Sequence, residues 1–353
     1  MELHIVSFGV GHELIGTNWQ NDRVGQSQVT MVALPIRISV MIPTYNQGHL
    51  ITQAVESALA QTYPNLEVIV SDDASTDHTQ EVLASIQDPR LKCHRNAINL
   101  GRVRNYRKLL FELVTGDYVV NLDGDDYYTD PGFIDAAVKR IQMNPDAVLV
   151  SARAVTKSAL GESVSPTPGE QVVSGKEVIK KLPDQRYRFM HMSAVYQRSK
   201  AIELDFYRSE TNSSDWESLY RLCMHGDIVY LDRAVGVWRI HGSNETGTTD
   251  TSKHLSNLSI WPAIFEHASH HGIGKIRAAW LQALCIAHFA EFSIGRTSIA
   301  GNSKTLEFLI GLFRRYPIGG LITMLNPRNL LIIFLALTGY YRRESSQVPS
   351  DNP

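Results

Sequence analysis

Between residues 36 and 150 the sequence alternates short apolar runs with helical segments, and this alternation limits the fold more than any other feature. The predicted strands are Ile38–Ile42, Leu66–Val70, Leu91–His94, Tyr118–Leu122 and Ala147–Val150. The predicted helices between them are His49–Gln61, Asp77–Ile86, Arg102–Val114 and Pro131–Gln142. Continuous apolar strands separated by helices of this length are typical of βαβ units. We therefore predict an α/β fold with a mostly parallel sheet flanked by helices.

Polar segments follow four of these predicted strands. In open parallel sheets, ligands bind beyond the carboxyl ends of the strands, at one edge of the sheet. The segments at that edge are Pro43–Asn46, Ser71–Ser75, Asn96–Gly101 and Asp123–Asp126. We expect all four to share one crevice.

Three carboxylates, Asp123, Asp125 and Asp126, stand where the run Tyr118–Leu122 ends. Carboxylates this close repel one another and lose hydration unless a cation neutralises them. Gly124 is expected to let the backbone turn tightly enough for its neighbours to face one ion. Oxygen ligands of this kind suit Mg²⁺ or Mn²⁺, which take further ligands from the phosphates of a substrate. The alternative is a solvated acidic turn before the next helix.

Composition and motifs exclude several classes of protein. The formal net charge is 34 − 36 = −2, which gives no positive field for nucleic acid. The three cysteines form no CxxC pair and no disulfide framework, as is usual in a reducing compartment. Gly9-Val-Gly11 lacks the third glycine of a dinucleotide-binding turn, and no Walker sequence occurs. No basic leader precedes the apolar patch Ile5–Val10, so no export signal is predicted.

Five segments of the chain, in one order and at characteristic spacing, resemble the family 2 inverting glycosyltransferases, which have the GT-A fold. These segments are Ile38–Asn46, Ala58–Glu67, Val70–Asp77, Asn96–Asn105 and Asp123–Asp126. The resemblance covers residues 36–245. It implies transfer of one sugar from a nucleotide-diphosphate-sugar, most commonly UDP-linked in this family, to a hydroxyl acceptor. The implied products are cell-surface polysaccharides or glycolipids.

The resemblance assigns the donor site to the crevice at the sheet edge. The residues that it implies for donor binding are Pro43, Thr44, Tyr45, Asn46, Asp73, Asn99, Gly101, Arg104, Asn105 and Asp123. Asp73 would accept a hydrogen bond from the base or ribose, and Tyr45 would form an aromatic wall. Two alternatives stay open: Ser75 or Asp77 caps the next helix, and Arg104 lies on a solvated helix face.

The resemblance also implies a metal site and a general base. Asp123 and Asp125 match the D-x-D metal motif of the family, and His241 falls in its late motif as a further ligand of Mn²⁺ or Mg²⁺. Asp215, in Ser-Asp-Trp-Glu, stands where the family has its catalytic base. The family more often has Glu-Asp there, and the serine before Asp215 departs from that pattern. Glu217, two residues further on, is the rival base.

Four regions are predicted along the chain. They are an N-terminal extension, partly disordered (1–35), a nucleotide-sugar-binding half (36–150), an acceptor-binding and catalytic half (151–245), and a helical region (246–353). In the helical region, the apolar runs Ile318–Leu325 and Leu330–Leu337 are too short to span a bilayer, and arginines flank them. Two interpretations stay open: peripheral contact with the cytoplasmic face of a membrane, and a buried helical hairpin or homo-oligomer contact.

His267, His270 and His271 have a helical spacing that could mimic a zinc site. No carboxylate or cysteine partner is nearby in the sequence, so we expect a polar helix face instead.

We predict a cytoplasmic enzyme that takes a nucleotide-sugar donor and a saccharide or lipid-linked acceptor. Two other functions are alternatives to this prediction. One is a non-catalytic scaffold subunit that binds a sugar nucleotide. The other is a nucleotidyltransferase, which would need a loop rich in glycine and basic residues after the first strand. Pro43–Gly48 offers no such loop, and the retention of Asp123, Asp125 and Asp215 favours an enzyme.

Overall fold

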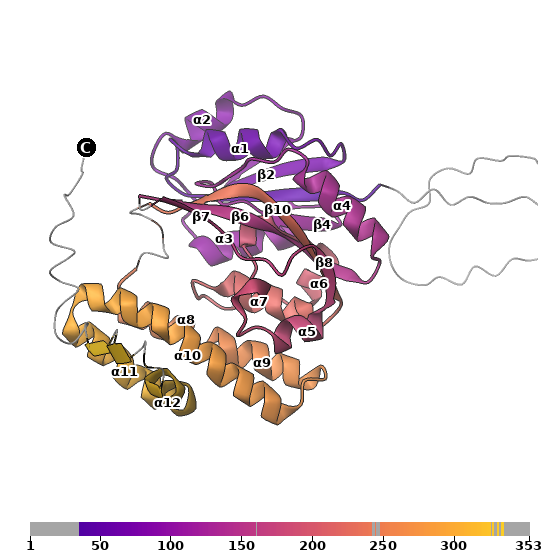
Figure 1. The fold of residues 1–353 in the computed structure, drawn as a ribbon. Coiled ribbons are helices and arrows are strands. Elements are labelled where there is room, and N and C mark those ends of the chain that lie inside the picture. The colour runs from indigo at the N-terminus through magenta and orange to yellow at the C-terminus, as the bar shows by residue number, and fades with distance from the viewer. Residues whose placement is uncertain are drawn as a thin grey trace, which may run out of the picture. The chain divides into compact units, whose positions relative to one another are not determined.

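The computed structural model describes residues 35–159, 161–241, 244, 248–325, 327, 330, 331, 333 and 334 (Figure 1). The described residues from Arg37 onward belong to one compact unit. The predicted N-terminal extension, residues 1–35, falls outside the described residues except for Pro35, so its partial disorder stays a prediction.

A ten-stranded sheet runs through the described part of this unit. Its path is β3-β2-β1-β4-β9-β6-β10-β5, with β7 paired to β6 and β8 paired to β10. The strands are β1 Ile38–Thr44, β2 Leu66–Asp72, β3 Leu91–Arg95, β4 Tyr118–Asn121, β5 Tyr127–Tyr128, β6 Ala147–Ser158, β7 Gly161–Val164, β8 Gln171–Ser174, β9 Ala194–Gln197 and β10 Asp227–Arg239.

The first four strands form a parallel block, as the sequence predicts. β1 and β2 are buried along their whole length, because their apolar sequences are covered on both faces of the sheet. Beyond β4 the sheet is mixed: β9 runs antiparallel to β4 and to β6, whereas β10 runs parallel to β6. The predicted α/β fold is confirmed, and its parallel character is concentrated in the first half.

Helices cover both faces of the sheet. They are α1 Ile51–Leu59, α2 Thr79–Ser85, α3 Arg102–Lys108, α4 Phe133–Met143, α5 Gly175–Lys180, α6 Arg198–Glu203, α7 Ser214–Cys223, α8 Thr251–Asn257, α9 Ile260–His270, α10 Lys275–Ala300, α11 Asn302–Arg315 and α12 Pro317–Leu325. α3 continues into a π-helical turn, Leu109–Leu113. In Figure 1, α1 and α2 lie on one face of the sheet, and α3 and α7 lie on the other.

The C-terminal helices pack directly onto α7. α9 lies against α7, and α10 lies against α9, α11 and α12 (Figure 1). The ring of Trp216 on α7 has its centroid 6.4 Å from that of Trp261 on α9 and 6.3 Å from that of Phe289 on α10. Such aromatic clusters bury a large apolar area, so helices outside the resemblance help to hold α7 in place. Among the described residues, every helix is too short or too polar to cross a membrane.

Candidate active site

The four polar segments at the sheet edge contact one another, as expected. The amide of Asp73 donates to the carbonyl of Thr44 (2.9 Å), and the amide of Gly124 donates to the carbonyl of Pro43 (3.1 Å). Asn46 lies in the left-handed region (φ 52°), which asparagine tolerates better than most residues. Its Oδ1 accepts from the amide of Thr76 (2.7 Å). These bonds fix the loop after β1 against the loop after β2.

The carboxylate of Asp73 is buried and holds the third of these segments. Its Oδ1 accepts from Asn96 Nδ2 and from the amide of Leu100, both at 2.8 Å. Its Oδ2 accepts from the amide of Gly101 (2.8 Å). Gly101, at φ 86°, has a conformation that residues with a Cβ rarely adopt, and its amide also donates to Asn99 Oδ1 (3.0 Å). Asp73 therefore shapes the loop before α3, and its bond to a base or ribose stays a prediction.

Asn105 and Arg104, adjacent on α3, face different surroundings. Asn105 is buried: its Nδ2 donates to the carbonyl of Ser71 (2.9 Å), and its Oδ1 accepts from the Ser71 hydroxyl (2.6 Å). Arg104 is exposed and pairs with Glu210 at 2.6 Å. Asn105 thus ties α3 to the end of β2. An exposed pair such as Arg104–Glu210 contributes little to stability.

The loop after β2 caps α2 through Asp77, as one alternative expected. Residue His78 occupies the N-cap position, and its side chain makes no capping hydrogen bond. Asp77 supplies the cap, because its Oδ1 accepts from the amide of Thr79, the first residue of α2 (3.0 Å). Its Oδ2 accepts from the amide of Gly48 (3.0 Å) and so ties this helix start to the loop after β1. Ser75 accepts from the amide of Asn46 (2.9 Å). Tyr45 remains 46% exposed, which leaves its ring open to a ligand.

The acidic turn after β4 brings three carboxylates together. Asp123, Asp125 and Asp126 offer oxygens within 4.8 Å of one another. Burial raises the pKa of Asp125, and the charge of Asp123 raises it further. Burial also raises the pKa of Asp126 well above its usual value, with the charges of Asp125 and Asp123 adding to the shift. The mutual repulsion expected from the sequence is therefore present.

Gly124 also makes room in this turn for side chains of the loop after β1. Its φ is not in the left-handed region. A Cβ at this position would lie 2.5 Å from Gln47 Oε1 and 2.8 Å from Thr44 Oγ1. Any other residue would displace the side chains of Gln47 and Thr44 from the acidic turn.

Four side chains or amides hold the acidic turn, and three of them come from distant parts of the chain. Asp123 Oδ1 accepts from the Tyr106 hydroxyl (2.7 Å) and from Asn121 Nδ2 (2.8 Å). The other two carboxylates contact the end of β10. His241 Nε2 lies 3.0 Å from Asp125 Oδ2, and the amide of Arg239 donates to Asp126 Oδ1 (2.9 Å).

This donor set fits Mg²⁺ or Mn²⁺. Carboxylate oxygens suit both ions, and an imidazole nitrogen is acceptable to Mn²⁺. The raised pKa values of Asp125 and Asp126 show that negative charge is crowded at this turn, and a dication would relieve that crowding. The residues available to hold it are Asp123, Asp125 and His241.

A cavity of about 540 Å³ lies beside the acidic turn. Its lining includes the carboxylates Asp123, Asp126 and Asp215, the cations Arg102, Arg188, Lys253 and Arg296, and the aromatic residues Trp216, Trp238, Phe289 and Phe292. Asp125, His241 and Asp73 do not line it. Each lies next to residues that do line it. Asp125 is close enough to Asp123 to feel its charge, and His241 contacts Asp125. Asp73 accepts a hydrogen bond from Gly101, the residue before Arg102.

Asp215 is half-buried on the first turn of α7, and no described residue donates a hydrogen bond to its carboxylate. Arg102 lies between the two acidic sides of the cavity. Burial lowers the pKa of Arg102, but the charges of Tyr106, Asp123 and Asp215 outweigh it and raise that pKa above its usual value. Arg102 therefore stays charged, and the cavity has a cation facing both Asp123 and Asp215.

The rival base Glu217 lies elsewhere. It is only 1% exposed, and its Oε1 contacts Arg221 Nε at 2.6 Å and Arg208 Nη2 at 2.8 Å. Arg221 is itself buried. A carboxylate held by two arginines inside the protein has no access to a substrate, and breaking such a buried pair is costly. Glu217 is structural.

The N-terminus of α7 is fixed by a residue that no predicted site motif singles out. Asn257, the last residue of α8, accepts from the amide of Ser213 (2.8 Å) and donates from Nδ2 to the Ser213 hydroxyl (2.9 Å). Ser213 is the N-cap residue of α7. The C-terminal region thus sets the position of the turn that carries Asp215.

Sequence reasoning also missed four residues around the acidic turn: Arg102, Tyr106, His191 and Arg239. His191 is half-buried beside the ring of Tyr106, with ring centroids 5.4 Å apart. Desolvation lowers its pKa, while Asp215 and Asp123 act in the opposite direction. The position of Arg102 at the start of a helix after a glycine was a usable signal. Tyr106, His191 and Arg239 have no such signal in the sequence, and only their surroundings in the fold identify them.

Residues 39–205 match the family model described as glycosyl transferase family 2. A 91-residue segment is 40% identical to an Escherichia coli enzyme, UDP-Glc:alpha-D-GlcNAc-diphosphoundecaprenol beta-1,3-glucosyltransferase WfaP, and spans 26% of this chain and 36% of that protein. The matched segment thus covers about a third of the length of such curated relatives.

Two solved structures have the same fold. Staphylococcus aureus TarS 1–349 in complex with UDP-GlcNAc superposes with a TM-score of 0.59 at 16% identity, over 87% of this chain and 92% of that chain. The mannosyltransferase PcManGT from Pyrobaculum calidifontis, in complex with GDP-Man and Mn²⁺, gives a TM-score of 0.53 at 17% identity, over 88% and 87% of the two chains. The likeness includes the helices beyond residue 245, since it covers most of both chains.

Proposed function

This chain belongs to glycosyl transferase family 2 through residues 39–205, and we propose that it is an inverting, metal-dependent glycosyltransferase. In this proposal the donor binds in the half formed by residues 36–150. The acceptor and the general base belong to residues 151–245, and residues 246–353 complete the acceptor side. The observation that carries the proposal is that Asp123 and Asp215 line one cavity.

The donor is a nucleotide-diphosphate-sugar, and UDP is the favoured nucleotide. WfaP is named for UDP-Glc, and TarS has been solved with UDP-GlcNAc, whereas PcManGT has been solved with GDP-Man. The exposed ring of Tyr45 is suited to stack on the base. Asp73 fixes the amides of Leu100 and Gly101, and this loop leads into Arg102, whose charge suits a phosphate.

Asp123, Asp125 and His241 would hold Mn²⁺ or Mg²⁺. When bound, the ion supplies positive charge that stabilises the departing diphosphate. Tyr106 and Asn121 keep Asp123 in one orientation by donating to its Oδ1. Arg239 does the same for Asp126. The protein thus presents its carboxylates already aligned, which avoids reorganisation during the reaction.

Asp215 is the proposed general base. A carboxylate that accepts no hydrogen bond from a described residue keeps its lone pairs for a substrate. It would take the proton from the acceptor hydroxyl as that oxygen attacks the anomeric carbon from the face opposite the diphosphate. One base is enough for inversion, because the nucleophile displaces the leaving group in a single step.

The acceptor is proposed to be a saccharide, free or lipid-linked, in cell-surface polysaccharide or glycolipid synthesis. Trp216, Trp238 and Phe289 give the cavity apolar walls on which a sugar ring can lie. Arg188 and Arg296 add positive charge that suits a diphosphate on the acceptor. WfaP, by its name, acts on a diphosphoundecaprenol-linked sugar.

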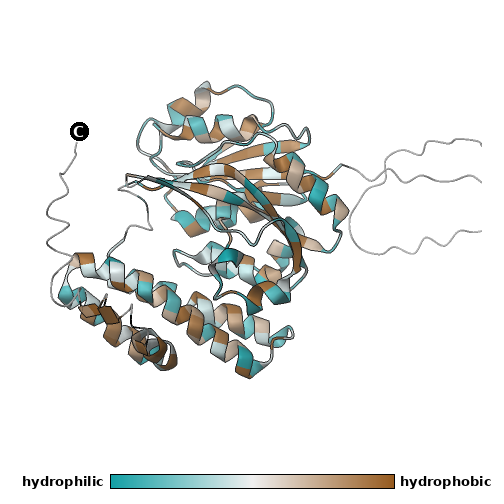
Figure 2. Ribbon diagram, in the orientation of Figure 1, coloured by the Kyte–Doolittle hydropathy of each residue, from teal (hydrophilic) through white to brown (hydrophobic). Residues whose placement is uncertain are grey.

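We also propose peripheral contact with the cytoplasmic face of a membrane through α11 and α12. Both helices carry exposed apolar side chains: Leu306, Ile310, Phe313, Ile318, Leu321 and Leu325. Figure 2 shows the hydrophobic character of α12. Arg314 and Arg315 stand in the last turn of α11, where they can approach anionic head groups. A homo-oligomer contact through the same face is the competing outcome.

The test is a donor screen with UDP-, GDP- and dTDP-sugars, with and without Mn²⁺, on wild type and Asp125→Asn. We expect a UDP-sugar to raise the melting temperature of wild type only when Mn²⁺ is present, and Asp125→Asn to lose that increase. Transfer to a lipid-diphosphate sugar should give a product of inverted anomeric configuration. Donor binding without transfer to any acceptor would support the scaffold subunit. Release of pyrophosphate from a nucleoside triphosphate and a sugar phosphate would support the nucleotidyltransferase.

A further inference from the structure

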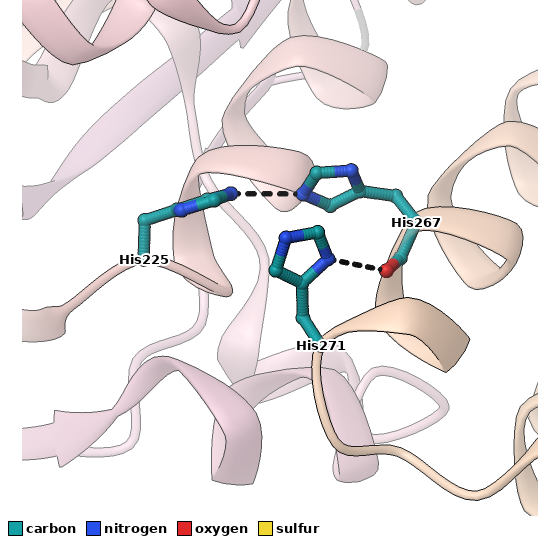
Figure 3. Close-up of side chains that lie close together, drawn as sticks. All are labelled: His225, His267 and His271. Carbon is teal, nitrogen blue, oxygen red and sulfur yellow. Dashed lines mark hydrogen bonds between the residues drawn. The ribbon is translucent and has the colours of Figure 1, made fainter.

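Three histidines converge at a place remote from the cavity (Figure 3). His225 follows the C-terminus of α7, His267 is on α9, and His271 is the residue after α9. His225 Nε2 and His267 Nε2 are 2.9 Å apart. One nitrogen of each of the three rings lies within 4.8 Å of the others. His270, which the sequence grouped with His267 and His271, is exposed and takes no part.

The tautomer of His271 is fixed by a backbone carbonyl. Its Nδ1 lies 2.8 Å from the carbonyl oxygen of His267. A carbonyl only accepts, so Nδ1 carries a proton, and in the neutral ring the lone pair is therefore on Nε2. Figure 3 shows Nε2 of His271 pointing toward the pair formed by His225 and His267. Histidines that bind metals are usually oriented in this way, by a hydrogen bond from the other ring nitrogen.

The contact between His225 and His267 requires a lone pair on one of their two Nε2 atoms. At 2.9 Å these nitrogens cannot both carry a hydrogen, so at least one of the two rings is neutral. Neutral imidazole is the form that binds a metal ion.

The charged neighbours of the cluster are themselves paired. They are Arg208 and Arg221, both paired with Glu217, and Lys200, paired with Glu203. The cations are thus partly neutralised by carboxylates, and the three imidazoles are the groups left to bind a ligand.

We propose that His225, His267 and His271 bind a divalent transition metal ion of the zinc class. Zn–N bonds of about 2.0–2.1 Å place tetrahedral ligand nitrogens about 3.3 Å apart. The His225–His267 pair would open by a few tenths of an ångström, and His271 would move inward. The half-exposed position of all three rings leaves room for water as a fourth ligand.

The role of this ion is structural. None of the three histidines lines the cavity that contains Asp215. The ion would join the C-terminal end of α7 to the end of α9, whereas Asn257 of α8 already fixes the N-terminal end of α7. The helix that carries Asp215 would then be held at both ends by the C-terminal region.

Zinc binding by the metal-free full-length protein tests the proposal. Competition with a chromophoric chelator is measured in an Asp125→Asn background, which weakens the acidic site. The chain offers a matched control in His270→Ala, since this histidine lies on the same helix but outside the cluster. Single variants His225→Ala, His267→Ala and His271→Ala should each bind zinc at least about a hundredfold more weakly. His270→Ala should bind zinc like its parent.

Zinc-edge X-ray absorption on the wild-type protein gives a second readout that does not depend on the folding of variants. With one equivalent of zinc we expect a shell of three imidazole nitrogens. A shell of oxygens with one imidazole would assign the ion to the acidic turn and overturn the proposal. So would the absence of zinc binding, or equal zinc affinity in the folded single variants and the control.

Discussion

The sheet edge that adjoins the cavity, which we propose as the donor side, and the wall that carries Asp215, which we propose as the acceptor side, hold their polar groups in opposite ways. On the donor side the side chains satisfy one another: Asp73 accepts three hydrogen bonds from the loop before α3, and Asn105 is bonded to Ser71. On the acceptor side, Asp215 receives no hydrogen bond from a described residue, and its helix is positioned by Asn257. In the proposed function, a preformed donor edge therefore faces a carboxylate that no described residue holds by a hydrogen bond.

Asp215→Asn gives the largest effect expected from this contrast. The amide keeps the shape of the side chain but cannot take a proton, so turnover should fall about 10²–10⁴-fold. The affinity for the UDP-sugar should not change, because the donor edge is built independently. Turnover at saturating substrates and calorimetric donor binding measure the two quantities.

Asp232→Asn is the matched control, since Asp232 pairs with Arg153 at the surface. Equal turnover in Asp215→Asn and this control would show that another group removes the proton.

Glu67→Gln tests how strongly the opposite end of the parallel strands, where β1 and β2 begin, depends on its internal hydrogen bonds. Burial raises the pKa of Glu67, but bonds from Ser39 and Thr115 and the charge of Arg37 outweigh it and lower the pKa from 4.5 to about 2. The folded pKa is the lower one, so this stabilisation is complete above pH 4.5 and is lost as the pH falls toward 2. Wild type should exceed Glu67→Gln in free energy of unfolding by about 3 kcal/mol at neutral pH.

Chemical denaturation across this pH range should show the difference between Glu67→Gln and wild type shrinking toward acid. Glu162→Gln, at an exposed position on β7, provides the control and should follow wild type. A gap between Glu67→Gln and wild type that stays constant with pH would contradict the assigned role of Glu67.

Asn257→Ala tests whether α8 positions the base. Loss of two hydrogen bonds to Ser213 at the start of α7 should cost about 1–2 kcal/mol of unfolding free energy. Turnover should fall with no change in the KM for the donor. Asn144→Ala removes a comparable bond at the end of α4, from Nδ2 to the carbonyl of Arg140, and should leave turnover intact. If both variants lose stability but neither loses turnover, Asn257 is merely structural.

Leu321→Glu should have the smallest effect. Replacing an exposed leucine on α12 by a carboxylate should weaken binding to vesicles containing phosphatidylglycerol by about 1 kcal/mol, or about fivefold. Met143→Glu, an exposed apolar position at the end of α4, is the control for added charge. If neither variant changes vesicle binding and light scattering reports a dimer, the apolar face is a contact between two copies.

The sequence predicted the fold and site best where polar residues directly follow a strand in one contiguous segment. The four parallel strands, the loops after them and the acidic turn are each contiguous, so their meeting at one edge follows from the fold class. The contact of His241 with Asp125 spans 116 residues. It could be anticipated only because a resemblance supplied the motif.

Other parts of the site depend on contacts that leave no local pattern. Asn257 acts on Ser213 from 44 residues away, and His225 meets His267 across 42 residues. The expectation that His267 and His271 lie on a polar helix face considered only their own helix. Likewise, Glu217 could not be separated from Asp215 by sequence, because only the fold shows that two arginines bury it.

The central claim is that the acidic turn and Asp215 serve one cavity. Anomalous diffraction at the manganese edge, from crystals grown with Mn²⁺ and UDP, tests it most directly. We predict a manganese peak at the carboxylates of Asp123 and Asp125, bridged to the diphosphate, with the diphosphate directed into the cavity that Arg102 and Asp215 line. A peak away from these carboxylates, or a diphosphate that points away from the side of Asp215, would contradict the account.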